Sequence, residues 1–160
     1  MADSIRAAPL FDLQLDPPPA GRRYDTGSET GMRRWIGIAM NGRFEGPALR
    51  GKVLPGGGDW AIMRSERQVT IDGRLTMETD DGAIIFMRYG GRFVIPPEVA
   101  AVSATDPDKQ IQLDPSQYYW RITPEFETGF TRYAWLNDIV SIGFGARQSR
   151  GIGYRILRVL

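Results

Sequence analysis

One stretch of the sequence places an acid among aromatic residues. The segment PEFETGFTRYAWLN, residues 124–137, carries Glu127 close to two phenylalanines, Tyr133 and Trp135. Apolar surroundings raise the pKa of a carboxyl group, which makes it available as a general acid near neutral pH. Glu127 is therefore a candidate catalytic residue, with Tyr133, Trp135 and Asn137 as candidate substrate-binding residues. The alternative is an ordinary aromatic core, from which the acid points outward or pairs with a neighbouring arginine.

A second acid follows three consecutive glycines. In the segment RGKVLPGGGDW, glycines 56–58 follow a proline and lead directly into Asp59 and Trp60. The segment is no phosphate loop, because it lacks the following lysine and hydroxyl residue and no helical pattern begins after it. The glycines instead predict a tight turn between two strands, with positive-φ positions. Asp59 would either hydrogen-bond this turn or face a cavity as a catalytic acid beside a substrate-binding Trp60.

The alternating segment RQVTIDGRLTMET predicts a strand with one apolar and one polar face. Asp72 and Arg74 lie on the polar face, between threonines and a glutamate. Two interpretations of this face remain open. It is either a solvated surface with weak ion pairs, worth ~0–1 kcal/mol each, or the polar lining of a barrel cavity. In the second case Asp72 is a further candidate catalytic residue, and Arg74 or Arg88 would bind a ligand carboxylate.

Three adjacent aromatic residues begin another predicted strand. In QYYWRI, alternation sends Tyr118 and Trp120 to one face, and Tyr119 and Arg121 to the other. Aromatic side chains on the inner face of a barrel would suit a planar or apolar ligand. They are equally compatible with an ordinary core.

Cysteine and histidine are absent from the chain. Their absence excludes thiolate nucleophiles, disulfides, iron–sulfur clusters, triads with an imidazole base, and ordinary transition-metal sites. Proton transfer at neutral pH must then use Asp, Glu, Tyr, Lys or water, and carboxylates suit it best because burial raises their pKa. The spacing in DGRLTMETDDG also misses the ligand order of a calcium loop. We therefore predict no cofactor and no metal site.

The elements that must position these residues are predicted to be strands. Short alternating segments recur with turn signals between them and without long 3.6-residue periodicity, which predicts an all-β fold of roughly nine or ten strands. At most one or two short helices are expected, at residues 97–102 and in AWLND, residues 134–138. Alternation alone does not separate a sandwich from a barrel. Several strands that are apolar on both faces favour a barrel whose outside is covered by another subunit.

Length and composition indicate one globular unit. The 160 residues match a single domain, taken as residues 1–160, in which residues 1–30 are the less certain part and PLFDLQLD predicts an edge strand. The formal net charge is +1 with arginines scattered among acids, so nucleic acid is not an expected partner. No apolar run reaches the roughly 20 residues that span a bilayer, and no signal peptide is visible. These features predict a soluble, cytoplasmic protein without membrane contact.

Three blocks of the sequence together resemble one family. They are GPALRGKVLPGGGDW, DGRLTMETDDGAIIFMRYGG and YWRITPEFETGFTRYAWLN, and they occur in this order over most of the chain. The chain resembles the conserved bacterial and fungal proteins of domain-of-unknown-function family 3237. The resemblance implies a small antiparallel β-barrel, similar to lipocalin-type or streptavidin-type barrels and commonly oligomeric. It implies no general activity, so it carries over no catalytic residue.

Three hypotheses for function follow. In the first, a barrel cavity binds a small molecule and uses carboxylates for acid–base chemistry, such as isomerisation, hydration, lyase or cyclisation reactions of an organic acid or phenolic metabolite. In the second, the cavity carries an apolar metabolite without catalysis. In the third, the protein is structural and acts through the surface of a homo-oligomer. An enclosed cavity that holds a carboxylate with a raised pKa would favour the first.

Overall fold

The structure is a computed structural model that describes residues 4–16, 23–27, 29, 31, 33–39, 41–100, 114–148 and 151–160. The strands are β1 (Ala7–Leu15), β2 (Arg23–Asp25), β3 (Arg33–Ala39), β4 (Gly42–Glu45), β5 (Arg50–Ser65), β6 (Gln68–Thr79), β7 (Ile84–Val94), β8 (Tyr119–Glu127), β9 (Ser141–Arg147) and β10 (Ile152–Val159). Two short 3-10 helices, η2 (Pro115–Gln117) and η3 (Thr131–Asp138), accompany them, and residues 97–100 form a helical turn. Both stretches predicted to be helical are therefore helical where the structure describes them.

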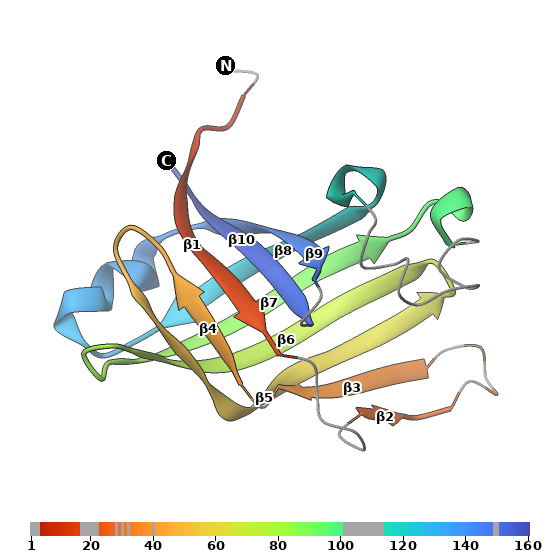
Figure 1. Cartoon of the computed structure of the whole chain (residues 1–160), viewed down its shortest axis with the longest axis horizontal. Coiled ribbons are helices and arrows are strands. Elements are labelled where there is room, and N and C mark those ends of the chain that lie inside the picture. The colour runs from red at the N-terminus through yellow and green to blue at the C-terminus, as the bar shows by residue number, and fades with distance from the viewer. Residues whose placement is uncertain are drawn as a thin grey trace.

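Eight of the ten strands close into an antiparallel barrel. β1 pairs with β4 on one side and β10 on the other, and the pairing continues through β9, β8, β7, β6 and β5 back to β4 (Figure 1). β2 and β3 are additional strands, attached to the barrel through β5. The predicted all-β barrel is confirmed. The prediction of β1 as an edge strand is wrong, because closure of the barrel pairs both of its edges.

Strand β5 runs through the glycine-rich segment without reversing. The predicted turn at glycines 56–58 is therefore wrong, since β5 is one strand of 16 residues. Its register against β6 shifts between Leu54 and Gly58, and Gly56 has a φ of 109°. A β-carbon on Gly58 would lie 2.6 Å from the carbonyl oxygen of Gly37. The glycines thus permit a bulge and a close strand approach, and β5 changes its partner from β4 to β3 across them.

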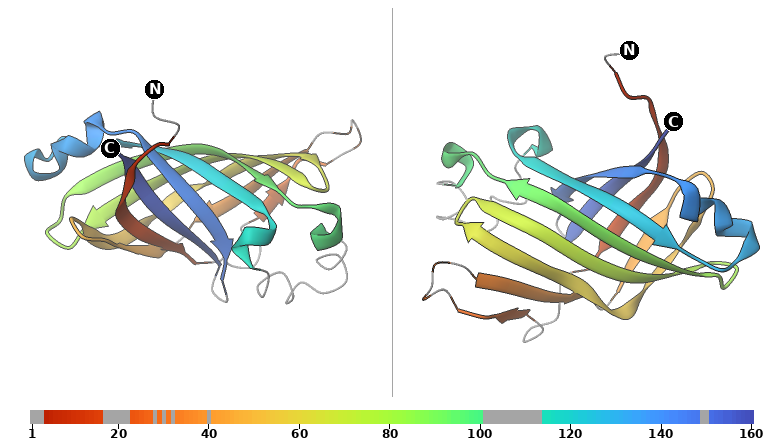
Figure 2. Two further views of the ribbon diagram at one scale, coloured as in Figure 1. Left: turned by 90° about the horizontal axis from the view of Figure 1, so that it is seen from above. Right: turned by 180° about the vertical axis from the view of Figure 1, so that it is seen from behind.

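The two ends of the barrel differ in what fills them. At one end, Tyr133 and Leu136 of η3 are buried in a continuous core with Phe44, Met77 and Ile85. Figures 1 and 2 show η2 and the helical turn at the opposite end. This core extends through the barrel toward the other end, where Ile71, Tyr89, Trp120 and Tyr154 belong to it. Within the described ranges, no helix has the length and apolar character needed to cross a membrane.

Candidate functional site

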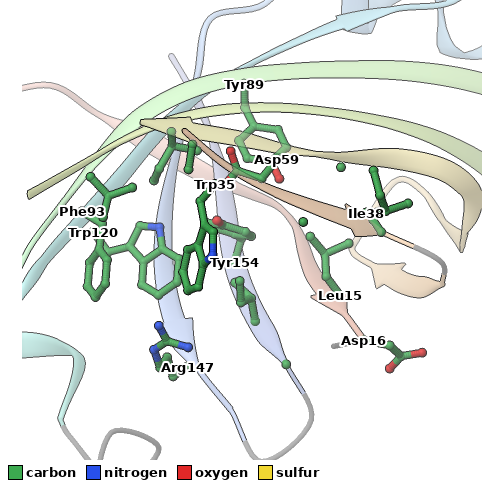
Figure 3. Close-up of a pocket in the computed structure, with 18 residues that line it drawn as sticks. Leu15, Asp16, Trp35, Ile38, Asp59, Tyr89, Phe93, Trp120, Arg147 and Tyr154 are labelled. Carbon is green, nitrogen blue, oxygen red and sulfur yellow. The ribbon is translucent and has the colours of Figure 1, made fainter. Parts of the chain in front are cut away.

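A cavity of about 190 Å³ lies among the strand ends opposite η3. Its wall combines side chains from seven strands of the barrel and from β3, and most of these side chains are apolar or aromatic. Figure 3 shows Trp35, Asp59, Tyr89, Trp120 and Tyr154 around this space. The cavity therefore combines flat apolar surfaces with a few polar groups, which is the usual make-up of a small-molecule site.

Asp59 faces the cavity because side chains alternate between the two faces of β5. It shares the inner face with Ala61, whereas Trp60 between them faces outward. In the register of the sheet, Asp59 stands between two glycines, Gly37 on β3 and Gly73 on β6. A β-carbon on Gly37 would meet no atom within 4 Å. The space beside the carboxyl is therefore open on the β3 side.

Burial raises the pKa of Asp59 to about 6. The carboxylate accepts a hydrogen bond of 3.1 Å from the backbone N–H of Asp72, which lowers the pKa, and the negative charge of Asp72 raises it. Burial outweighs the hydrogen bond, because a single amide replaces only part of the water that an exposed carboxylate would bind. Asp59 thus gains and loses its proton close to neutral pH.

Two buried tyrosines accompany this carboxyl. Tyr89 is the cross-strand partner of Gly73, and its ring covers that glycine so closely that a β-carbon there would overlap the ring. The ring centroids of Tyr89 and Tyr154 are 5.7 Å apart. Burial raises the pKa of both hydroxyls, and the negative charge of Asp59 raises both as well. The two tyrosines therefore remain neutral hydrogen-bond donors at physiological pH.

Trp120 supplies an aromatic wall of the cavity. The centroid of its ring lies 4.4 Å from that of Phe93, and it meets Tyr154 edge to face at 5.7 Å. A β-carbon on Gly145 would lie 2.5 Å from the indole, so this glycine makes the space for the ring. Trp120 is only 5% exposed. Its indole hydrogen-bonds the Tyr154 hydroxyl outside normal geometry, and this contact lowers the pKa of that hydroxyl.

Two charged side chains, Arg147 and Asp16, also line the cavity, and Figure 3 places them on opposite sides. The positive charge of Arg147 lowers the pKa of Tyr154, which places this cation on the side of the aromatic wall. In the part of the chain that the structure describes, no group of three or more acidic side chains is arranged to hold a metal ion. The polar and aromatic groups that line the cavity are therefore two carboxyls, two tyrosine hydroxyls, two tryptophan indoles and one guanidinium.

The chain matches one protein family over most of its length. A family model described as protein of unknown function, DUF3237, matches residues 6–159. The chain belongs to the DUF3237 family. A UPF0311 protein from Rhodopseudomonas palustris strain TIE-1 is 34% identical to it over 132 residues, which are 82% of each chain.

Solved structures share the fold of this DUF3237 chain. A β-barrel-like protein from Acinetobacter baumannii is 30% identical, with a TM-score of 0.81 over 100% of this chain and 99% of its own. An enzyme from Penicillium herquei has a TM-score of 0.71 at 16% identity, over 100% of this chain and 98% of its own, which shows likeness of fold alone. The resemblance read from three sequence blocks is confirmed.

Of the predicted site residues in this DUF3237 chain, Asp59 is the one that lines the cavity. Asp72 and Arg74 form an ion pair of 3.0 Å on the outer face of β6, and the Arg74 guanidinium lies 5.4 Å from the Trp60 ring. In the structure this polar face of β6 is solvated and lies outside the cavity, because the apolar face of β6 turns to the core. Arg88 pairs with Glu125, also on the exposed outside.

The remaining predicted residues lie around η3, away from the cavity. Glu127 is exposed at the end of β8. The Asn137 side chain holds the loop that follows β8. Its amide oxygen accepts a hydrogen bond from the N–H of Thr128, and its amide nitrogen donates one to the carbonyl of Thr128, both at 2.9 Å. The Tyr133 hydroxyl donates to Asp81 at 2.9 Å, and Trp135 packs against the core. In the structure these contacts hold η3 against the barrel end.

Sequence reasoning did not identify Tyr89, Tyr154 and Trp35 as cavity residues. Each is one inward-facing aromatic residue in an alternating strand, which is also the pattern of an ordinary core. The distinguishing signal is a glycine directly opposite an aromatic residue, as for Gly73 and Tyr89. That signal appears only once the strand register is known. By contrast, the predicted alternation is confirmed here: Tyr118 and Trp120 are buried, and Tyr119 is exposed.

Proposed function

We propose that this DUF3237 protein binds a small ring-containing organic compound in the cavity and moves a proton on it with Asp59. The reaction class is acid–base chemistry of the isomerase, hydratase, lyase or cyclase type. The compound is an organic acid, a phenol or a related carbonyl compound. Of the three candidate catalytic acids in the sequence, this proposal keeps Asp59.

The observation that carries the proposal is a carboxyl with a pKa of about 6 on the wall of an apolar cavity. A general acid–base group works best when its pKa lies near the operating pH, because both protonation states are then populated. Tyr89 and Tyr154 keep their protons, so they can donate hydrogen bonds to charge that develops on a substrate oxygen. A carboxyl that ionises near neutral pH, beside tyrosine hydroxyls that stay neutral, is a combination suited to proton transfer.

The size of the cavity limits the ligand. An apolar cavity of roughly 150 Å³ holds one benzene molecule. The cavity of about 190 Å³ therefore accommodates a single ring with a short substituent. Trp35, Phe93 and Trp120 offer the flat apolar surfaces that such a ring packs against.

The proposed reaction begins when ionised Asp59 takes a proton from an O–H or activated C–H bond of the substrate. The electron pair of that bond stays on the substrate and shifts toward an oxygen atom, where hydrogen bonds from the tyrosines stabilise the charge. Protonated Asp59 then returns its proton at a different atom of the same molecule. For an isomerisation or a cyclisation, this sequence balances protons and electrons without a further reactant.

Acetophenone provides a test that does not require the natural substrate. Exchange of its methyl hydrogens for deuterium in D2O reports proton abstraction next to a carbonyl, and proton NMR measures the rate. We expect the wild-type protein to catalyse this exchange and Asp59→Asn to reduce the catalysed rate by about 10²-fold or more. The wild-type rate should rise with pH through about 6, because only the ionised carboxyl is a base.

Two further variants serve as controls for this test. Gly37→Val places a side chain in the open space beside Asp59 and should block both binding and exchange. Asp72→Asn alters an acid on the outer face of the neighbouring strand and should retain exchange. Full activity in Asp59→Asn would remove the proposed role of Asp59.

A non-catalytic carrier of an apolar metabolite is the second candidate function, and the largely aromatic lining of the cavity favours it. Binding of probes to the wild-type protein without any catalysed exchange would support it over catalysis. The homo-oligomer expected from the sequence stays a prediction, and sedimentation equilibrium would test it.

A further inference from the structure

We propose that Arg147 binds a carboxylate of the ligand at the edge of the cavity, so that the cavity selects aromatic acids over neutral ring compounds of the same shape. This inference rests on the proposed function in so far as it requires a ring compound in the cavity. It adds a specificity-determining residue and narrows the substrate class to ring compounds with an acidic substituent.

Arg147 is the last residue on the inner face of β9. Gly143 and Gly145 precede it on this face and are buried, whereas Arg147 is half-buried and lines the cavity. Its cross-strand partner on β10, Ile152, lines the cavity as well. Gly145 makes room for the Trp120 ring, so the guanidinium belongs to the next inward position beyond the aromatic wall. Alternation along β9 thus directs a positive charge toward the cavity.

The charges around the cavity favour one orientation of an anionic ligand. Arg147 is the one cation among the described residues that line the cavity, and Figure 3 places the two acids, Asp16 and Asp59, apart from it. A ligand carboxylate is attracted by the cation and repelled by the ionised acids, and apolar surroundings screen these forces less than water does. An aromatic acid would therefore bind with its carboxylate at Arg147 and its ring within the cavity.

Tyr154 lies between Asp59 and Arg147 in the view of Figure 3. Burial raises the pKa of its hydroxyl and the negative charge of Asp59 raises it further, whereas the positive charge of Arg147 lowers it. The hydroxyl is thus within electrostatic reach of both charged groups. A ring that packs against Tyr154 therefore has the cation on one side and the proposed acid–base carboxyl on the other.

A guanidinium suits a carboxylate in shape as well as in charge. Its planar fork of N–H donors matches the two carboxylate oxygens, and such bidentate pairs are stronger than hydrogen bonds between neutral groups. Its five donors also let Arg147 keep other contacts while it binds a ligand. The sequence offered Arg74 or Arg88 for this role, but both form ion pairs on the outside of the barrel.

Benzoate and benzamide are the probes for this inference, because they share one shape and differ in charge. We expect the wild-type protein at pH 7 to bind benzoate about tenfold or more tightly than benzamide in isothermal titration calorimetry, the difference expected for a charged hydrogen-bonded pair. Arg147→Gln keeps a polar side chain without the positive charge and should abolish this preference. Arg88→Gln removes an arginine from the outer face of β7 and should keep it.

Chemical modification of the wild-type protein keeps the test independent of how the variants fold. Butanedione reacts with arginine side chains, and peptide mass spectrometry measures how fast each one is modified. Benzoate at about ten times its Kd should slow the modification of Arg147 about tenfold, because the bound carboxylate covers the guanidinium. Benzamide at the same occupancy should slow it much less, and neither probe should change the modification of Arg88.

The outcomes separate this inference from the proposed function. Equal affinity for the two probes, modification of Arg147 that benzoate does not slow, or a preference for benzoate that persists in a folded Arg147→Gln variant each overturns the role of Arg147 and leaves the ligand cavity standing. Failure of both probes to bind overturns the cavity as a site for one-ring ligands, and the inference with it. The preference for benzoate should persist in Asp59→Asn, so loss of the proposed catalytic role of Asp59 would leave the carboxylate site intact.

Discussion

Asp59→Asn is expected to make the protein more stable at neutral pH, by roughly 2–3 kcal/mol, because the wild-type carboxyl must ionise in a buried position where its pKa is about 6. In the unfolded chain this group ionises at its ordinary value of 3.8. Between these two values the folded protein holds a proton that the unfolded chain has released. The neutral amide of asparagine avoids the cost of this buried charge and can still accept the hydrogen bond from Asp72.

The sign of the effect gives a test by pH. A raised folded-state pKa means that the contribution of Asp59 to stability falls as pH rises from about 4 to 6 and stays low above that. Urea unfolding of wild type and Asp59→Asn should therefore agree closely at pH 4 and separate by pH 7.5. Asp72→Asn, which alters a partly exposed ion pair, should show a much smaller difference. A constant difference between wild type and Asp59→Asn across this range would contradict burial as the cause.

Gly73→Ala is expected to destabilise the protein by about 1–3 kcal/mol, because the new methyl group would occupy the position of the Tyr89 ring. Tyr89 is 2% exposed and packs against Tyr154, so the ring cannot swing into solvent to make room. Its displacement should also move the hydroxyl away from Asp59. Urea unfolding and acetophenone exchange would measure the two consequences separately.

Gly90→Ala is the matched control for this substitution. Gly90 lies next to Tyr89 on β7, and the nearest atom to an added β-carbon is a carbonyl oxygen of Ile71 at 3.9 Å, an ordinary contact. Both substitutions reduce the freedom of the unfolded chain in the same way, so the difference between them reports the folded state. Equal stability of the two alanine variants would show that the Tyr89 ring accommodates the methyl group.

The sequence predicts much of the fold and little of the site, and the difference has a physical cause. Alternation and turn signals are local, so they suffice for an all-β fold and for the placement of Trp120 and Tyr119 on opposite faces of β8. Nearness in sequence also misleads: Phe126 and Glu127 are neighbours in the chain, but they face opposite sides of β8, one buried and one exposed. The sequence therefore predicted aromatic surroundings for Glu127, whereas in the structure its side chain is exposed.

The cavity depends on register, which no single segment contains. Tyr89, Gly73 and Asp59 meet in one row across three strands only because β5, β6 and β7 pair as they do. Asp59 was identified from the glycines before it, although those glycines form a bulge and not the expected turn. The residues of the cavity come close together only through pairing between strands, and no single segment of the sequence shows this pairing.

The position of β3 outside the closed ring of eight strands has a consequence for protein engineering. Trp35, Gly37 and Ile38 of β3 line the cavity, yet the hydrogen bonds that close the barrel do not pass through this strand. One wall of the cavity can therefore be redesigned for a different ligand while the closed ring and the packed core at the η3 end are left unaltered. Ligand preference and the integrity of the barrel are in this sense separable properties of the fold.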